Sequence, residues 1–524
     1  MTAPVLTPYR SAAPAGHDGF AQLLWAEWTK FRTVRGWVIG MIVAGLLTVG
    51  VGLLSHGECG SQIGGSAVTG GPGCTRPLGP AGEGVTDGFY FVHQPLGTSG
   101  SITVRVTSMT GSYSPDGVST QDLKQGLQPW SKAGIIIKAS ATEGSAYAAM
   151  MVTGSHGVRM QWNYTGDAAG LGGAVSPASP RWLRLTRTGD TVTGYDSADG
   201  TAWTRVGSVT LAGLPSTVPA GLFAASPDHS TMTSQSIGGG SGSGGPSQAT
   251  AAFDQVTLQG GWPTGQWTGT TVGGPSSGPY PVLGYRQAGG GLVVSGSGDI
   301  APVIPDTEGS VAGALIGAFA GLIAVVVVAA MFMTAEYRRG LIRVTLTASP
   351  RRSRILAAKA IVVGSAAFAV ALSAAVASAL IEGPRARSRG IFVDPVPMLT
   401  EVRVVAGTAA LLAVAAVLAV ALGALVRRSA LAVTTVIAVI VLPYFFAVPL
   451  AVLPAGAADW LLRVTPAAGF AIQQPYPAYP QVATSYLPGN GYYPLAPWAG
   501  FGVLCAWTAL ALGLAMYLLR RRDA

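Results

Sequence analysis

Long uncharged apolar runs alternate with short basic segments in two parts of the chain. The runs cover residues 36–55, 311–334, 360–381, 404–426, 429–448 and 497–519. Each has the roughly 20 residues that a helix needs to cross a hydrocarbon core about 30 Å thick. The pattern therefore predicts six transmembrane helices, one near the N-terminus and five within residues 310–524.

Between the first and second runs the pattern changes from helical to strand-like. Residues 85–260 hold short stretches in which every second residue is apolar, as in SITVRVTS (101–108) and GVRMQWNY (157–164). Turns rich in Gly, Pro and Asp separate these stretches, which is typical of an antiparallel sandwich. We therefore expect an all-β domain inserted between the first two spans, with linkers at residues 56–84 and at the Gly/Ser/Pro-rich residues 261–309.

Two further segments are apolar on one face but too short or too polar to span a membrane. Within residues 1–35, the stretch 20–35 (FAQLLWAEWTKFRTVR) groups aromatic residues on one helical face and predicts a helix lying in the interface. Glu27 falls in the middle of that face and disrupts it unless it pairs with Lys30. In the loop 449–496, residues 459–474 predict a re-entrant or interfacial helix, and the tyrosines after it favour an interfacial belt over a ligand site.

The basic residues indicate an orientation. Positively charged connectors stay on the cytoplasmic side, and Lys/Arg clusters precede the first run, separate the second and third, and follow the last. We expect a multi-pass cell-membrane protein with both termini cytoplasmic and residues 56–309 extracellular. Arg385, Arg387 and Arg389 in an outer loop oppose this rule, and a pair of re-entrant or interfacial segments stays the alternative for that hairpin.

Composition supports a membrane protein and argues against nucleic-acid binding. The chain is 49% hydrophobic and only 10% charged, with a mean hydropathy of +0.43. Residues 56–310 hold 15 Asp/Glu against 11 Lys/Arg, so the overall charge of +9 arises beside the apolar runs. Membrane topology explains this excess better than phosphate binding does.

Glycines and cysteines add two structural expectations. Gly313, Gly317 and Gly321 form a stripe at four-residue spacing, which allows another helix to approach closely. Cys59 and Cys74 flank a Gly-rich loop just beyond the first span, and we expect a disulfide between them, with two unpaired thiols as the alternative.

Several chemistries are not favoured by the sequence. None of the lysines is followed by Ser or Thr, so a G-x-x-x-x-G-K-[ST] phosphate loop is missing. The histidines show no metal-ligand spacing, and the six runs contain no charge of the kind that marks ion or proton relays. We therefore expect a non-enzymatic chain without catalytic, cofactor-binding or metal-binding residues.

The basic segment between the second and third runs, residues 336–354, carries a more specific pattern. It reads EYRRGLIRVTLTASPRRSR, an E-x-x-x-G motif followed by a short apolar helix and then by Pro350 and Ser353-Arg354. An ordinary positively charged loop is one interpretation, and a cytoplasmic helix that docks on a partner is the other. Together with the interfacial helix 20–35, the six spans and the short helix 459–474, the segment resembles the coupling segment of a type-2 ATP-binding-cassette (ABC) exporter membrane subunit.

The resemblance implies a permease that works as a homodimer with a separate ATPase subunit. The chain itself would bind no cofactor, and ATP would act through the partner. The apolar spans suggest a lipophilic or amphipathic export substrate. The residues implied to couple to the ATPase are Glu336, Arg338, Arg339, Gly340, Leu341, Ile342, Arg343 and Leu346.

The β region has a resemblance of its own. Residues 181–207 (RWLRLTRTGDTVTGYDSADGTAWTRVG) are similar to part of a concanavalin-like jelly roll. That resemblance implies a glycan ligand by analogy of fold alone. Glycan hydrolysis is disfavoured, because Glu143 is the only glutamate between Glu83 and Glu308. A membrane-anchored glycan-binding or sensing protein is therefore the alternative function.

Overall fold

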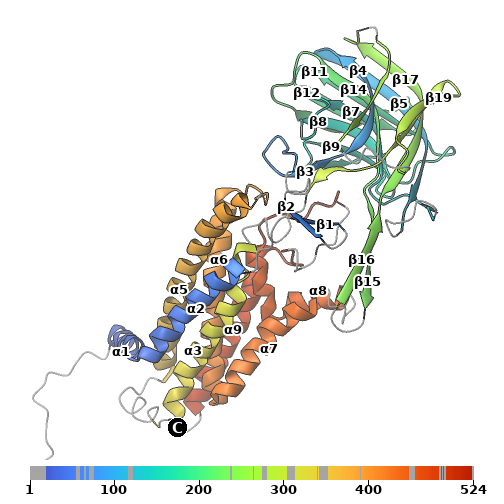
Figure 1. Ribbon diagram of the computed structural model, residues 1–524. Coiled ribbons are helices and arrows are strands. Elements are labelled where there is room, and N and C mark those ends of the chain that lie inside the picture. The colour runs from blue at the N-terminus through green and yellow to red at the C-terminus, as the bar shows by residue number, and fades with distance from the viewer. Residues whose placement is uncertain are drawn as a thin grey trace, which may run out of the picture.

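The computed structural model describes residues 19–54, 60–63, 66–69, 76–115, 122–235, 239–263, 265–273, 280–303, 313–338, 340, 352–389, 391–447, 455–482, 486, 488 and 491–521. These residues form a bundle of long helices with an all-β domain beyond one end of it (Figure 1). In chain order, the β domain falls between the second and third α-helices.

Six of the described helices are long and apolar enough to cross a membrane. The helices are α1 (Phe20–Thr33), α2 (Arg35–Leu54), α3 (Ala318–Arg338), α5 (Arg352–Ser388), α6 (Met398–Val426), α7 (Ser429–Ala447), α8 (Ala455–Val464) and α9 (Pro497–Arg521), with 3-10 turns η2 (Gly313–Leu315) and η3 (Pro466–Gln473). The candidate spans are α2, α3, α5, α6, α7 and α9. The six long apolar helices predicted from hydropathy are thus present, as in a multi-pass membrane protein.

The ends of two helices differ from the expected ones. The second span begins at Ala318 rather than at residue 311, after the turn η2. The third span, α5, runs from Arg352 to Ser388 and thus includes charged residues at both ends. Arg385 and Arg387 lie in its last turn, where cations interact favourably with the negative end of the helix dipole. Hydropathy alone placed these residues in a loop because it detects only the apolar part of a helix.

Small residues let the helices approach closely. A Cβ atom on Gly317 would collide with the Thr48 carbonyl of α2, and one on Gly321 would collide with the Thr48 hydroxyl. Gly313 is buried in η2, just before α3. Around this contact the membrane helices share one apolar core, made largely of Ala, Val and Leu.

The β domain contains two large antiparallel sheets. One has the strand order β10-β9-β8-β7-β14-β4-β18, and the other has the order β13-β12-β11-β5-β17-β20-β19, with β6 paired to β5. The strands are β1 (Gly60–Ile63), β2 (Ser66–Thr69), β3 (Val85–Asp87), β4 (Phe89–Leu96), β5 (Ser99–Tyr113), β6 (Lys124–Gln125), β7 (Lys132–Lys138), β8 (Tyr147–Thr153), β9 (Val158–Trp162), β10 (Gly166–Ala169), β11 (Arg181–Thr188), β12 (Thr191–Ser197), β13 (Thr204–Thr210), β14 (Val218–Ala225), β15 (His229–Gln235), β16 (Gly239–Gly245), β17 (Ser247–Gly260), β18 (Thr268–Val272), β19 (Gly284–Ala288), β20 (Gly291–Gly296) and β21 (Ile300–Pro302).

Alternation of apolar and polar residues builds the core between these sheets. In β11, Leu183 and Leu185 are buried, whereas Arg184 and Thr186 point the other way. The strand β7 is buried along its whole length, because Ile135 and Ile137 face the core between the sheets and Ile136 faces a second core. The expectation of an all-β sandwich is therefore confirmed.

The Gly-rich residues 261–309 are not simply a linker, so that expectation is wrong. They include β18, which adds an edge strand to one sheet, and β19 and β20, which extend the other. Leu292 and Val294 of β20 reach the core and anchor the strand. The alternation in β20 is short and flanked by glycines, so the sequence alone did not predict a strand there. Pairing with β17 stabilises β20 as a strand.

The sandwich contacts the membrane part at defined points. The strands β3 and β21, which lie near the two ends of the domain in the sequence, pair with each other. Next to β3, the Gly84 N–H donates to Asp394 Oδ1 at 3.0 Å, in the loop after α5. Gln481, which follows η3, donates to the carbonyl oxygens of Tyr164 and Thr165 at 3.3 and 3.2 Å. We call these contacts the junction.

Candidate functional site

Four charged side chains meet at the end of the helix bundle away from the sandwich. They are Glu27 and Lys30 on α1, Glu336 in the last turns of α3, and Lys359 near the start of α5. We call this group the charged cluster. It joins α1 to α3 and α5, which lie about 300 residues later in the sequence.

Lys359 is at the centre of the charged cluster. Its Nζ donates to Glu27 Oε2 at 2.7 Å and to Glu336 Oε1 at 2.6 Å. Lys30 Nζ bridges the same carboxylates, at 2.9 Å from Glu27 Oε1 and 3.2 Å from Glu336 Oε1. The side chain of Lys359 is 0% exposed and that of Glu27 is 1% exposed, whereas that of Lys30 is 44% exposed. The two positive charges thus balance the two negative charges. Lys30 is the partly exposed cation and lies at the rim of the charged cluster.

The local sequence explains this geometry. Glu27 and Lys30 are three residues apart and therefore lie on one face of α1. The same face carries Phe31, whose ring packs edge-on against Phe332 of α3 at 5.8 Å. Phe332 is one helical turn before Glu336, and the Lys359 ammonium lies 4.9 Å from its ring. Aromatic packing therefore brings α1 to the place where its carboxylate meets the lysine of α5.

The electrostatics require all partners to be present. Removing a charged group from water is costly, and a buried pair offsets that cost only when its hydrogen bonds are made. At the rim, burial lowers the pKa of Lys30, but hydrogen bonding and charge interaction with Glu27 and Glu336 outweigh this, so its pKa is raised. Lys30 therefore carries its positive charge at neutral pH.

The charged cluster flanks the predicted coupling segment. The helix α3 ends at Arg338 and α5 begins at Arg352, so Glu336 lies just before residues 339–351 and Lys359 lies two turns after them. Among the predicted coupling residues, Arg338 and Gly340 are exposed, and Gly340 adopts a left-handed φ of 67°. The others, Arg339, Leu341, Ile342, Arg343 and Leu346, lie outside the described residues. Glu336 faces inward to Lys359, an internal partner that the sequence analysis did not include.

About half of this site could be predicted from the sequence. A pair between Glu27 and Lys30 was the condition under which the face of helix 20–35 stays amphipathic, and the structure has that ion pair. The predicted span 360–381 contains no charge but is shorter than the helix, because α5 begins at Arg352; Lys359 therefore lies inside the helix, just before the apolar run. The available signal was a carboxylate on the apolar face of helix 20–35, which requires a cation opposite it.

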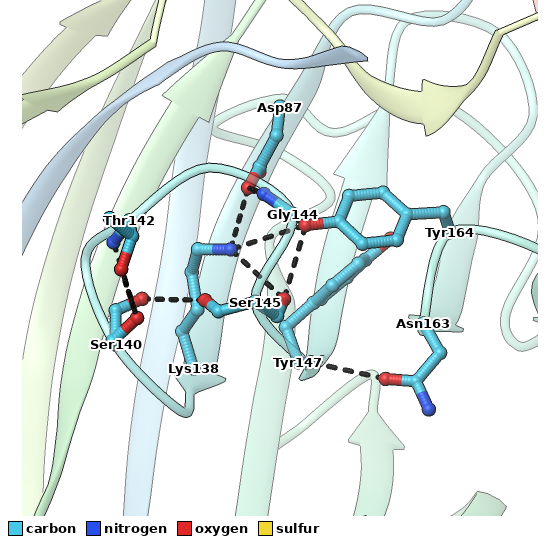
Figure 2. Close-up of polar contacts among 9 residues, drawn as sticks. All are labelled: Asp87, Lys138, Ser140, Thr142, Gly144, Ser145, Tyr147, Asn163 and Tyr164. Atoms are coloured by element: carbon cyan, nitrogen blue, oxygen red, sulfur yellow. Dashed lines mark hydrogen bonds and ion pairs between the residues drawn. The ribbon is translucent and has the colours of Figure 1, made fainter. Parts of the chain in front are cut away.

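A second buried polar group lies inside the sandwich, and Figure 2 shows it. Lys138 Nζ lies 2.6 Å from Asp87 Oδ2, and the Tyr164 hydroxyl donates to the same oxygen at 2.7 Å. The Gly144 N–H donates to it as well, at 2.8 Å. Burial lowers the pKa of Lys138, against the effect of Asp87. We call Asp87, Lys138 and Tyr164 the sandwich cluster.

Other predicted site residues are placed as follows. Cys59 and Cys74 lie outside the described residues, so the disulfide stays a prediction. Cys505 on α9 is a free thiol. In the portions of the chain that the structure describes, no group of three or more His, Cys, Asp or Glu side chains is arranged to hold a metal ion.

Solved structures resemble part of the chain only weakly. A functionally unknown protein from Saccharomyces cerevisiae is 17% identical, with a TM-score of 0.20, over 34% of this chain and 76% of its own. The GH43 protein BlXynB from Bacillus licheniformis is 14% identical, with a TM-score of 0.18, over 28% of this chain and 26% of its own. Scytalido-glutamic peptidase is 10% identical, with a TM-score of 0.23, over 40% of this chain and 98% of its own. These values are too low to assign the sandwich to any of their folds, and the concanavalin-like jelly roll stays a prediction.

The family comparison is decisive for the membrane part. No curated protein matches the chain. A family model described as "ABC-2 family transporter protein" matches residues 136–524, which include α3 to α9 and the greater part of the sandwich. The family provides membrane transport components rather than catalytic enzymes, and these generally work with a separate ATPase subunit. The chain therefore belongs to the ABC-2 family of transporter proteins, as a membrane permease component.

Proposed function

We propose that this chain is the permease of an ABC exporter and couples ATP hydrolysis by a separate ATPase to movement of a lipophilic or amphipathic substrate. The observation that carries the proposal is the charged cluster. It holds the helices on both sides of residues 339–351 to each other and to α1. A force applied to that segment would therefore act on α1, α3 and α5 together.

The expected mechanism is a change between two packed states. Two copies of the chain would pair with two ATPase subunits, which alone bind ATP. Closure of the ATPases would push on residues 339–351, and the charged cluster would transmit this push as a rigid-body movement of the helices. In this proposal the termini are cytoplasmic and the sandwich is extracellular.

Partner capture tests the proposal. The full chain and its Leu341→Glu/Leu346→Glu variant are purified by affinity from native membranes, and bound proteins are identified by mass spectrometry. We expect an ATP-binding subunit with the unmodified chain and at least tenfold less with the variant. A Leu78→Glu/Val282→Glu variant is the matched control. Leu78 and Val282 are both exposed, and both belong to the sandwich end of the molecule rather than to residues 339–351.

Two results would contradict the proposal. One is the absence of an ATPase under conditions that preserve a known transporter complex. The other is equal recovery with the two double variants. Size-exclusion profiles of the detergent-solubilised proteins show that each variant is folded.

A second candidate, glycan binding by the sandwich, has one supporting observation. On the outer face of the larger sheet, the Arg184 guanidinium stacks 3.9 Å from the ring centre of Trp203, and Arg105 lies 5.7 Å from that of Trp182. Arg105 is held by Asp254 through two hydrogen bonds. Such half-buried aromatic and charged pairs suit the apolar faces and hydroxyl groups of sugars. Binding of the full chain to cell-wall glycans, lost in Trp203→Ala, would support this function.

A further inference from the structure

A pocket lies at the other end of the membrane helices, beside the junction. Its volume is about 510 Å³. Its lining includes Leu399, Thr400 and Arg403 from the first turns of α6, Gln474 and Tyr476 after η3, and Trp498 at the start of α9. It is distinct from the charged cluster, which lies on other helices, α1, α3 and α5, at the opposite end of the bundle.

The charge around the pocket favours an anion. Arg403 is half-buried, and its Nη2 donates to the Gln474 carbonyl oxygen. Its Nε is buried and, among the described residues, has no hydrogen-bond partner. Guanidinium groups bind carboxylates and phosphates through two parallel N–H groups. A second ligand oxygen would therefore satisfy a donor that the protein leaves unused.

The surrounding helices add to this preference. Both α6 and α9 begin at the pocket, at Met398 and Pro497, and the N-terminal end of a helix carries a partial positive charge. Among the described residues that line the pocket, none is a carboxylate. The nearest acidic groups in sequence are Glu401, which is exposed in the same turn of α6, and Asp394, which is turned to Gly84 in the junction.

The rim of the pocket is apolar. Leu399 is 86% exposed and Trp498 is 66% exposed. Both lie at the first turn of a membrane helix, the level at which tryptophan and lipid headgroups meet. The pocket thus offers a cationic interior next to an apolar surface, which matches an anionic headgroup attached to hydrocarbon chains.

The loop that closes the pocket is also tied down. The side chain of Gln474 donates to the Tyr476 carbonyl oxygen at 2.9 Å and accepts from the Tyr493 N–H at 3.2 Å. The Tyr476 hydroxyl donates to the Asp394 carbonyl oxygen at 3.2 Å. The anion site is therefore built on fixed groups, which reduces the entropy lost on binding.

We propose that this pocket binds the anionic headgroup of a membrane lipid, with the acyl chains lying along Leu399 and Trp498. The phosphate oxygens pair with Arg403 and lie at the partly positive N-terminal ends of the two helices. This inference does not depend on the proposed transport function, because a lipid can bind whether or not an ATPase is present.

Lipid retention by the purified full chain tests the inference. The protein in detergent is titrated with phosphatidylglycerol or with phosphatidylcholine, and bound lipid is counted by native mass spectrometry. Both lipids carry a phosphate, but phosphatidylcholine also carries a choline cation, which the positive charge at Arg403 repels. We therefore expect phosphatidylglycerol to bind more tightly, by about tenfold. Equal affinity for the two lipids would overturn the inference.

Two variants of Thr400 test the location without removing Arg403. In Thr400→Glu the new carboxylate is three residues from Arg403 and occupies the place of the phosphate, so we expect the preference for phosphatidylglycerol to be lost. Thr400→Gln matches the size of the glutamate without its charge, so it should keep the preference for phosphatidylglycerol that Thr400→Glu loses. Equal retention by the two variants would contradict the assignment.

Two further experiments distinguish a specific lipid site from general charge attraction and from a site for free phosphate. Arg463→Gln on α8 removes a positive charge outside the pocket and should leave the binding unchanged; an equal loss would mean that the anionic lipid is attracted by general charge only. Glycerol phosphate at millimolar concentration provides the headgroup without the chains. Full competition by it would show a site for free phosphate and would overturn a lipid ligand.

Discussion

The two parts of the molecule each bury a lysine, but they use it differently. In the sandwich cluster, Lys138 is held by one carboxylate, the Tyr164 hydroxyl and the Ser145 carbonyl oxygen, all within a single domain. In the charged cluster, Lys359 is held by two carboxylates from two other helices. The first arrangement fixes the interior of one folded unit, whereas the second connects helices that surround a segment between them.

The difference shows what each part of the chain requires. A sandwich with a continuous core is stabilised mostly by apolar burial, and Asp87, which is paired with Lys138, also holds the Gly144 loop next to β3. The membrane helices gain little from the hydrophobic effect against one another, because lipid is equally apolar. Specific polar contacts such as the charged cluster therefore decide how these helices are arranged.

The largest expected effect is that of Lys359→Met. It leaves the carboxylates of Glu27 and Glu336 buried next to each other with only the rim lysine, at a cost of about 3–5 kcal/mol. We expect a marked decrease in the thermal unfolding temperature in detergent and loss of coupling to ATP hydrolysis. Lys30→Met is the control with a smaller effect, because that side chain is partly exposed.

A triple variant sharpens this result. In Lys359→Met/Glu27→Gln/Glu336→Gln the buried charges are removed together, so a large part of the stability should return. Coupling should not return with it if the ion pairs transmit the movement. Full recovery of both properties would show that the charged cluster only fills space.

The next effect is in the sandwich. Asp87→Asn deprives the buried Lys138 of its counter-charge and should destabilise the sandwich by about 3 kcal/mol. Tyr164→Phe removes only one hydrogen bond to Asp87 and should cost about 1 kcal/mol. Hydrogen exchange of β7 and β8 measures both.

The comparison predicts that these two sandwich variants leave exchange in α3 and α5 unchanged. If Asp87→Asn instead loosened the membrane helices as much as Lys359→Met does, the two clusters would not be independent. Gln481→Ala, which removes the hydrogen bonds to Tyr164 and Thr165, would then identify the path between them.

The smallest effect is a pH dependence of the junction. Burial raises the pKa of Glu83 and of Asp394, although backbone hydrogen bonds oppose it. A carboxyl with a raised pKa binds its proton more tightly in the docked state than in the open state. Contact between the sandwich and the membrane part at the junction is therefore most stable at low pH. It weakens as the pH rises from about 4 through the raised pKa values, and above them it no longer changes with pH.

Hydrogen exchange of peptides covering residues 391–397, corrected for the intrinsic pH dependence of exchange, measures this change. We expect greater protection at pH 4.5 than at pH 7.5. Asp394→Asn cannot titrate and should reduce the difference. A junction that becomes more protected with rising pH would contradict the assignment.

Much of this architecture follows from local patterns in the sequence. Uncharged runs of helical length predicted the six apolar helices. Alternation predicted strands such as β11, and the aromatic face of residues 20–35 predicted α1. The pair Glu27–Lys30 could also be predicted, because its geometry depends only on the pitch of one helix. Each of these features depends on residues within a few turns of one another.

Other features depend on segments that meet only in the folded chain. The position of Lys359 inside a helix, the strands β18 to β20 in a Gly-rich region, the junction and the Arg403 pocket all require a distant partner. The sequence by itself determined which surfaces must be buried, since burial follows from the local order of apolar residues. Tertiary structure decided which charges meet, because the pairing of charges on separate helices depends on packing that no local pattern encodes.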